Sequence, residues 1–439
     1  MSRYSKGYAF VRTIVVLPVF RLFYRRIQVI GHPVPKGPVI FAPNHQNSLM
    51  DAICILCTCN RQPVFVARAD IFRGNGFIIR ILHFLRILPI YRKRDGVNTE
   101  ENNRDTFDIL LKTLHNNRAA GIMPEGTYSR LKRLQQLQKG IFRIAMKAQE
   151  KYGNRPYIKI IPVGLEYSDI RKFRSDVIIR YGKPMEMSDY YGLYAENPSK
   201  AFKQMQTALS DRMKEGMIHI ENDTCYNEIN WARRIFEKEA LRQLALKNDG
   251  EGRLIAQQHL VAALEAMATH HLEEMAGLSA DIREYAALLD RFRFRDWVVR
   301  QPYSPVALLW RALLLLAGTP VWLMGMLFNY PPYKLSEWVS RLPKDSQFFS
   351  SVQYVGGIVF FPLYHLTLAA LSVIFIPCLP GKICLILLLL PTGLFSFIWY
   401  LSFKKLTANL RFRLQPKERS VRMVQLRKTI LEKIGLSEQ

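Results

Sequence analysis

Short apolar runs alternate with stretches of helical periodicity through about the first 190 residues of the chain. The runs have the length and composition of buried strands, and they cover residues 38–42, 64–68, 121–123, 157–163 and 177–181. Helical spacing of apolar positions is found in residues 52–56, 71–85, 98–115 and 139–148. Strands that alternate with helices predict an α/β fold with a mostly parallel central sheet flanked by helices.

The pattern changes after Pro198, where strand-like runs give way to a charged region rich in Ala and Leu. Residues 231–247 and 254–275 have the periodicity of amphipathic helices, and a further helix is expected over 280–292. The histidines of this region lack the carboxylate pattern of a metal site; they are His259, His270 and His271. We expect a helical insert that packs on the core, dimerises or docks a donor protein.

Three stretches near the C-terminus are apolar over the length that crosses a membrane: residues 306–328, 356–377 and 383–401. Basic residues flank them on both outer sides, and three complete spans cannot keep both flanks on the cytoplasmic side. Because the first stretch contains Arg311 and Pro320, we expect the last two to form the membrane hairpin. Residues 407–439 have a basic helical pattern suited to a membrane surface.

Residues 8–24 are apolar and aromatic but are interrupted by Arg12, Pro18 and Arg21. This stretch is too short and too charged for a span, which needs about 20 apolar residues. Two interpretations stay open: an interfacial helix, with Arg25 and Arg26 at its edge, or a helix packed on the α/β region.

Charge and cysteine content narrow the possible partners. The 62 Lys and Arg residues against 36 Asp and Glu residues give a formal net charge of +26, which suits nucleic acid, an anionic membrane or an acidic substrate. The sequence has no nucleic-acid-binding motif, and its apolar stretches favour a lipid bilayer as partner.

Cys54, Cys57 and Cys59 share one apolar segment without a second ligand cluster, so we expect buried thiols and no metal. No disulfide framework or cleavable signal is predicted.

The candidate chemistry begins with His45 and Asp51, which lie between an apolar run and an expected helix. Side chains at such a turn can face a substrate while a rigid scaffold holds them. A carboxylate on one nitrogen of a histidine fixes its tautomer and stabilises the imidazolium. His45 is then a candidate general base, although a single His near an Asp is more often ordinary surface polarity.

A second stretch, Gly121 to Ser129, favours the catalytic interpretation of His45. It is an apolar run that ends in Pro124-Glu125-Gly126-Thr127. Glycine lets the main chain approach a ligand closely, and exposed amides with hydroxyls suit phosphate. Alone, this stretch is also compatible with an ordinary turn.

Four blocks together resemble the glycerophospholipid acyltransferase superfamily, whose members acylate glycerol 3-phosphate or 1-acylglycerol 3-phosphate. The first block is Asn44-His45 followed by Asp51, and the third is Pro124-Glu125-Gly126-Thr127. The second is the Arg-bearing segment Ile90-Tyr91-Arg92-Lys93-Arg94, and the last is the strand Ile160-Ile161-Pro162-Val163-Gly164. The resemblance covers about residues 10–190.

The resemblance implies a role for each block. His45 and Asp51 are the expected catalytic pair, and Asn44, Pro124 and Pro162 belong to the acyl-binding and structural motifs. The phosphate and glycerol of the acceptor are expected on Arg68, Arg92, Arg94, Glu125, Gly126 and Thr127. No metal and no cofactor are implied, because the acyl donor is itself a thioester, acyl-CoA or acyl carrier protein.

Two departures from the family pattern concern the site itself. Five residues separate His45 from Asp51, where four are usual, and this spacing resembles that of a subset of glycerol-3-phosphate and dihydroxyacetone-phosphate acyltransferases. Tyr128 follows Thr127 where the family has Arg. The resemblance implies that Arg92, Arg94 or Arg130 supplies that phosphate contact, or that the contact is missing.

The expected organisation has five segments: an N-terminal interfacial membrane helix (1–30), an acyltransferase domain (31–197), a helical insert (198–303), transmembrane helices (304–403) and a basic cytoplasmic tail (404–439). The expected function is a membrane-bound acyltransferase of phospholipid biosynthesis. Its catalytic domain is expected on the cytoplasmic face, where it acylates glycerol 3-phosphate or lysophosphatidate.

Two alternatives stay open. One is a different acceptor, such as another lysophospholipid, an aminolipid or a lipid A precursor. The other is a non-catalytic lipid-binding membrane protein of the same fold, which the longer spacing and Tyr128 would favour.

Overall fold

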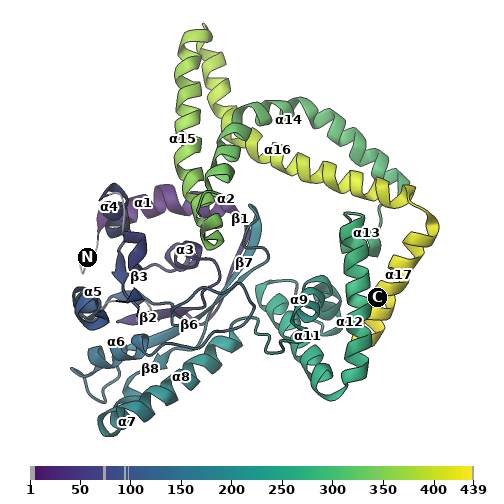
Figure 1. The fold of residues 1–439 in the computed structure, drawn as a ribbon. Coiled ribbons are helices and arrows are strands. Elements are labelled where there is room, and N and C mark those ends of the chain that lie inside the picture. Colours follow the sequence, from purple (N-terminus) through teal and green to yellow (C-terminus); the bar gives the residue numbers. More distant parts are fainter. Residues whose placement is uncertain (1–4, 73–75, 93–94, 97, 344, 438–439) are drawn as a thin grey trace. The chain divides into compact units, whose positions relative to one another are not determined.

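The structure, a computed structural model, describes residues 5–72, 76–92, 95–96, 98–343 and 345–437 (Figure 1). It divides into two compact units. The first comprises Met1–His219 with Asp345–Ser351, and the second comprises Ile220–Lys344 with Val352–Gln439.

The first unit is built on one sheet with the strand order β1-β7-β6-β2-β5-β3-β4, and β8 pairs with β6. The strands are β1 (Tyr24–Gly31), β2 (Val39–Pro43), β3 (Val64–Arg68), β4 (Ile87–Ile90), β5 (Ala119–Gly121), β6 (Lys159–Tyr167), β7 (Ser175–Tyr181) and β8 (Met185–Glu186). The pairs from β6 through β2, β5 and β3 to β4 are parallel, whereas β7 and β8 run antiparallel to β6. The predicted α/β fold with a mostly parallel sheet is confirmed.

Helices cover both faces of this sheet (Figure 1). They are α1 (Lys6–Val11), α2 (Leu17–Phe23), α3 (Leu49–Thr58), α4 (Gly76–Phe84), α5 (Thr99–His115), α6 (Gly140–Gln149), α7 (Tyr191–Glu196) and α8 (Pro198–Glu215). Ile40 and Ala42 of β2 pack with apolar side chains of α5, α6 and α8. Phe41, between them, points the other way and meets the ring of Tyr181. This alternation is what a strand buried on both faces requires.

The strand order explains why residues far apart in the sequence meet. Parallel strands end at the same edge of a sheet, and ligand sites form at that edge. Four neighbouring strands, β6, β2, β5 and β3, end at this edge. Tyr167 ends β6, His45 follows β2, Glu125 follows β5 and Arg68 ends β3. Arg92 follows β4 at the far end of the same row.

The N-terminal segment differs from the prediction of a helix over residues 1–30. The helix ends at Phe23, after a π-helical stretch at Arg12–Val16 between α1 and α2, and Tyr24–Gly31 form strand β1. β1 pairs with β7, and Arg25 forms an ion pair of 2.7 Å with Asp176. The helix buries Tyr8, Phe20 and Phe23 while Phe10 and Ile14 are exposed, so it has a packed side and an open apolar side.

The second unit is helical and contains no strand among its described residues. Its helices are α9 (Tyr226–Ile235), α10 (Glu237–Gln243), α11 (Gly250–His270), α12 (Leu272–Arg291), α13 (Asp296–Arg300), α14 (Pro305–Val339), α15 (Phe349–Phe375), α16 (Leu379–Leu414) and α17 (Lys417–Ile434). The α15 range begins within the part of the chain assigned to the first unit. Helix α8, placed by composition with the helical insert, instead buries Ala201, Met205 and Leu209 in the core under the sheet.

Two described helices are long and apolar enough to cross a membrane, Pro305–Val339 and Ser346–Phe375. A third candidate exists if the two halves of α16, bent by 47° between Leu389 and Pro391, are taken as one span. The first stretch, set aside in favour of the last two because of Arg311 and Pro320, is thus a candidate span as well. Pro320 does not end α14, which continues past it, and the length and apolar content of α14 qualify it as a span.

The basic tail is not a free surface helix. Met423, Leu426 and Ile430 of α17 are buried, and α17 packs along α12 within the second unit. The side chain of Arg427 is 1% exposed and forms ion pairs with Glu239 at 2.5 Å and Asp296 at 2.9 Å. The regular spacing of buried residues along α17 fits a packed helix better than a membrane-surface one.

Candidate active site

The predicted pair of His45 and Asp51 is in direct contact. Asp51 lies in the first turn of α3, and its Oδ2 is 2.9 Å from His45 Nδ1. The His45 side chain is 20% exposed whereas Asp51 is fully buried. The ring therefore has one nitrogen tied to a buried carboxylate while part of the ring is open to solvent.

Asp51 is held from several directions. Its Oδ2 also accepts hydrogen bonds from the main-chain N–H groups of Gln46 at 3.0 Å and Asn47 at 2.9 Å. Its Oδ1 accepts from the Tyr167 hydroxyl at 2.7 Å. Both oxygens of the buried carboxylate are thus satisfied inside the protein, as a buried charge requires.

The extra residue between His45 and Asp51 is accommodated by a tight turn. Ser48 has φ 48° and ψ −123°, and Met50 N–H donates to Asn47 O at 2.9 Å. These are the features of a turn whose second residue has positive φ, a conformation that favours glycine. The longer spacing therefore brings Asp51 to His45 at the expense of local strain at Ser48, of about 1–3 kcal/mol for a residue in such a region.

Glu125, from the second predicted motif, holds the main chain of His45. Its Oε1 accepts from His45 N–H at 2.7 Å, and its Oε2 accepts from Gln135 N–H at 2.8 Å. Burial raises the pKa of Glu125 to about 7, and the two main-chain donors partly offset that rise. Glu125 thus joins the loop after β5 to the turn after β2 and titrates near neutral pH.

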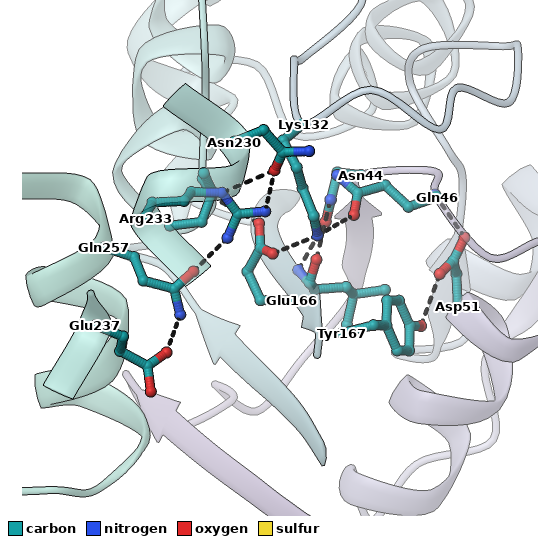
Figure 2. A network of polar contacts seen from close by, with 12 residues as sticks. Asn44, Gln46, Asp51, Lys132, Glu166, Tyr167, Asn230, Arg233, Glu237 and Gln257 are labelled. Carbon is teal, nitrogen blue, oxygen red and sulfur yellow. Dashed lines mark hydrogen bonds and ion pairs between the residues drawn. The ribbon is translucent and has the colours of Figure 1, made fainter. Parts of the chain in front are cut away.

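A buried lysine holds the same turn from a further direction (Figure 2). Lys132 Nζ donates to Gln46 Oε1 at 2.8 Å and to Glu166 Oε2 at 2.5 Å, and Glu166 Oε1 accepts from Ile218 N–H at 2.7 Å. Glu166 is the residue before Tyr167 on β6. The end of β6 therefore reaches two residues of the turn between His45 and Asp51: Gln46 through Lys132, and Asp51 directly through Tyr167.

The residues expected to have structural roles lie where the strands end. Asn44 is fully buried, and its side chain accepts from Leu165 N–H at 2.7 Å and donates to Leu165 O at 3.2 Å. These two hydrogen bonds continue the pairing of β2 with β6 one residue past Pro43, the last residue of β2. Pro162 pairs with Ala42 inside the sheet, and Pro124 O accepts from Gln138 N–H at 2.7 Å.

The arginines expected to bind phosphate are occupied by carboxylates. Arg68 forms ion pairs with Asp70 at 2.5 Å and Asp345 at 3.7 Å, and Arg92 pairs with Asp95 at 3.1 Å. Arg94, the third predicted arginine, lies outside the described residues. A phosphate at Arg68 or Arg92 must therefore share the guanidinium with a carboxylate.

The loop after Glu125 faces the imidazole. Gly126 has φ 62° and is exposed, and Thr127 is half-buried beside it. The Tyr128 ring meets the His45 ring edge-on at 6.1 Å between centroids, and Arg130 Nε donates to the Tyr128 hydroxyl at 3.2 Å. Arg130 is therefore the arginine of this loop that is linked, through Tyr128, to the surroundings of His45.

An open cavity of about 820 Å³ lies elsewhere in the same unit, lined by His32, Lys36 and Arg61. Lys36 and Arg61 precede the strands β2 and β3, and His32 follows β1, whereas His45 follows the C-terminal end of β2. The cavity is therefore not part of this site. Among the residues that the structure describes, no group of three His, Cys, Asp or Glu side chains is placed to hold a metal ion.

Comparison with known proteins identifies the domain that carries this arrangement. The family model described as Acyltransferase matches residues 26–166, which contain His45, Asp51 and Glu125. Residues 26–166 thus form an acyltransferase domain, and the relatives described next support the glycerophospholipid acyltransferase superfamily.

Relatives of the acyltransferase domain include two proteins of Saccharomyces cerevisiae. Glycerol-3-phosphate O-acyltransferase 2 is 25% identical over 144 residues, which cover 32% of this chain and 19% of the relative. Glycerol-3-phosphate O-acyltransferase 1 is 23% identical over 198 residues, which cover 44% of this chain and 25% of the relative. The similarity thus spans a quarter or less of the length of these relatives.

One solved structure also aligns with the chain. It is the crystal structure of the 1-acyl-sn-glycerophosphate (LPA) acyltransferase PlsC from Thermotoga maritima, at 16% identity and a TM-score of 0.34. The alignment covers 49% of this chain and 84% of that one.

The sequence patterns of the acyltransferase domain did not predict the residues behind the pair of His45 and Asp51. Tyr167, Glu166 and Lys132 carry no motif of their own, and their contacts cross 34 to 116 residues of sequence. The only local signal is a Glu-Tyr pair that closes an apolar strand, where a charged residue is expected to be exposed.

Proposed function

We propose that this chain is a membrane-bound acyltransferase that moves a fatty acyl group from a thioester, acyl-CoA or acyl carrier protein, to a hydroxyl of glycerol 3-phosphate or lysophosphatidate. The observation that carries the proposal is the contact of 2.9 Å between His45 Nδ1 and Asp51 Oδ2 in an acyltransferase domain. The names of the two yeast relatives support glycerol 3-phosphate as the first acceptor to test.

The first chemical step follows from the arrangement of the pair. A carboxylate oxygen accepts, so His45 Nδ1 carries the proton of the bond to Asp51 and Nε2 keeps its lone pair. Nε2 takes the proton of the acceptor hydroxyl while that oxygen attacks the thioester carbonyl carbon. Asp51 stabilises the imidazolium that forms.

The second step returns the proton. The tetrahedral intermediate collapses, the carbon–sulfur bond breaks and the new ester bond remains. The sulfur leaves as a thiol with the proton held by His45, so the enzyme regains its first state without an acyl-enzyme. Glu125 takes no proton in this scheme, because both of its oxygens accept main-chain N–H bonds that fix His45 in place.

We propose that arginines of the second block bind the acceptor phosphate. An Arg donates two parallel hydrogen bonds to a phosphate, which gives both affinity and orientation. Arg92, Arg94 and the Gly126–Thr127 turn are the proposed binding elements, with Arg68 next to them in the strand order. Since Asp95 occupies Arg92, a phosphate there must replace or share that ion pair.

The acyl chain and the product require a lipid phase. The two candidate spans and the net charge of +26 support a bilayer as the partner, with the acyltransferase domain on the cytoplasmic face. Each Lys or Arg close to an anionic leaflet contributes about 1 kcal/mol to binding.

Mass spectrometry of the products tests the proposal directly. The purified full chain in lipid is offered acyl-CoA or acyl carrier protein thioesters with a mixture of glycerol 3-phosphate, lysophosphatidate and other lysolipids. We expect acylated glycerol phosphate from the wild type and none above background from His45→Ala. Transfer that persists in His45→Ala, or transfer only to acceptors without phosphate, would overturn the assignment.

A further inference from the structure

We propose that Tyr167 is a positioning residue of the acyl-transfer site, which holds the Asp51 carboxylate in the orientation that His45 needs. The inference rests on the function proposed above. The Tyr167 hydroxyl donates to Asp51 Oδ1 at 2.7 Å, while Asp51 Oδ2 lies 2.9 Å from His45 Nδ1. One carboxylate oxygen is thus fixed by the phenol and the other serves the imidazole.

The contact is sealed from water. Asp51 is 0% and Tyr167 5% exposed, so a lost hydroxyl would leave Oδ1 buried with no solvent to replace it. Burial raises the pKa of Tyr167 well above its ordinary value, and the charge of Asp51 raises it further. The phenol therefore keeps its proton and acts as the donor.

The longer turn explains why an outside contact is needed. The bond between the β-carbon and the carboxyl group of an aspartate rotates over a broad, shallow profile. The turn that joins His45 to Asp51 contains the strained residue Ser48. A donor on a rigid strand fixes the plane of the carboxylate independently of that turn.

The end of β6 holds the catalytic turn from two faces. Neighbouring residues of a strand point to opposite faces, and Glu166 reaches Lys132, whose Nζ donates to Gln46 (Figure 2). Tyr167, on the other face, reaches Asp51. Gln46 and Asp51 flank the strained part of the turn, so its two ends are each tied to the same strand.

Several titratable and charged groups surround His45 and can affect the pH dependence of its reactions. Asp51 faces it from α3, and Glu125 and Tyr128 face it from the loop after β5. Tyr167 and Cys54 lie behind Asp51, and Arg130 lies behind Tyr128. Glu125 has no contact with Tyr167, so Tyr167 variants are compared with the wild type under the same conditions and the difference is assigned to the contact with Asp51.

Replacement Tyr167→Phe removes the hydroxyl and keeps the ring. We expect kcat for acyl transfer to fall about ten- to a hundredfold, with KM for the acceptor within about threefold, since orientation rather than binding is lost. The acidic limb of the pH profile should move up, because a carboxylate without its phenol donor holds the imidazolium proton more tightly. In an Asp51→Asn background, Tyr167→Phe should have no further effect on kcat.

Tyr181→Phe is the matched control. Tyr181 is buried, is the last residue of the neighbouring strand β7, and its hydroxyl is 2.8 Å from Thr58 Oγ1 on the same helix α3. This variant tests the loss of a buried hydroxyl that contacts α3 at a position away from Asp51. We expect it to change thermal stability but neither kcat nor the pH profile.

A second substitution keeps the test open if Tyr167→Phe does not fold. 3-Fluorotyrosine at position 167 keeps the packing and donates a stronger hydrogen bond, so the acidic limb should move to lower pH. The inference would be overturned if the 3-fluorotyrosine protein had the same pH profile and the same kcat as the wild type. The same result in a folded Tyr167→Phe protein would also overturn it.

Carbethoxylation of His45 separates this inference from the proposed function. Diethyl pyrocarbonate modifies the unprotonated ring, and peptide mass spectrometry measures the rate at His45 without any turnover. If the wild type acylates nothing, the proposed function fails, while the pH dependence of carbethoxylation still tests Tyr167. We expect its midpoint to move up in Tyr167→Phe and down with 3-fluorotyrosine; identical curves would refute a positioning role.

Discussion

Burial sets the properties of the ionisable side chains around His45. Asp51 is a buried acceptor with partners on both oxygens, which suits a permanent partner of the imidazole. Glu125 is also buried, but it contacts the His45 main chain, and the proposed scheme moves no proton through it. Two carboxylates at one histidine thus have different tasks, one electrostatic and one structural, because they contact different atoms of that residue.

The raised pKa of Glu125 predicts a pH-dependent stability. Its pKa rises from an ordinary value of 4.5 to about 7 in the folded chain, so the contribution is complete below about pH 4.5 and is lost as the pH rises through 7. Glu125→Gln does not titrate in this range. Over it, we expect the wild type to lose roughly 3 kcal/mol relative to the variant, measured by unfolding in detergent from pH 4 to 8. A difference that is constant or increases with pH would contradict this assignment.

At the level of elements, the order of the strands creates the site. His45, Glu125 and Tyr167 follow or end β2, β5 and β6, which are neighbours in the sheet. The alternation of apolar runs and helices predicted this sheet, and the motifs predicted the strand ends at which His45, Asp51 and Glu125 meet. The alternation did not predict β1, because Arg25 and Arg26 interrupt its apolar pattern and one of them is neutralised by the distant Asp176.

A buried ion cluster also escaped prediction, and it fixes helix α17 in the second unit. A basic helix in isolation is expected to be exposed, and only the fold shows that Arg427 faces Glu239 and Asp296. Arg427→Ala removes the buried cation between the two carboxylates and leaves Glu239 with Arg300 at 3.4 Å, so we expect a loss of about 3–5 kcal/mol. Unfolding of the full chain in detergent, followed by tryptophan fluorescence, measures it.

Arg422→Ala is the control on the same helix. Arg422 pairs with Glu284 at 2.9 Å, but both side chains are largely exposed. Such pairs contribute about 0–1 kcal/mol. Equal losses in the two variants would show that the Arg427 cluster does not hold α17.

For the whole molecule, one segment links the acyltransferase unit to an apolar helix. Residues Asp345–Ser351, at the start of α15, belong to the first unit, where Asp345 pairs with Arg68 and the Ser350 hydroxyl donates to Ile170 O. If α15 crosses a bilayer, its start lies on the same side as the domain. Sequence patterns could not show this, because the contact joins residues 180 positions apart.

Cys378 offers a test of the topology. Helix α15 has 27 residues, about 40 Å, which exceeds the roughly 30 Å of the bilayer core. We expect the exposed Cys378 that follows it to lie on the side opposite the acyltransferase domain. For this test, the other cysteines are replaced and the chain is placed in sealed vesicles with the acyltransferase domain outward. Cys378 should then react with an impermeant maleimide only after the vesicles are permeabilised. Lys172→Cys, exposed on the domain, should react at once; early reaction at both positions would exclude α15 as a span.

The rate of acyl transfer by Asp51→Asn, measured beside the wild type on the acceptor that the product analysis identifies, tests the central claim most directly. The amide keeps the shape of the carboxylate but cannot stabilise an imidazolium, so we predict a fall in kcat of about a thousandfold or more in a chain that still folds. A folded Asp51→Asn protein whose kcat stays within about tenfold of the wild type would contradict the account.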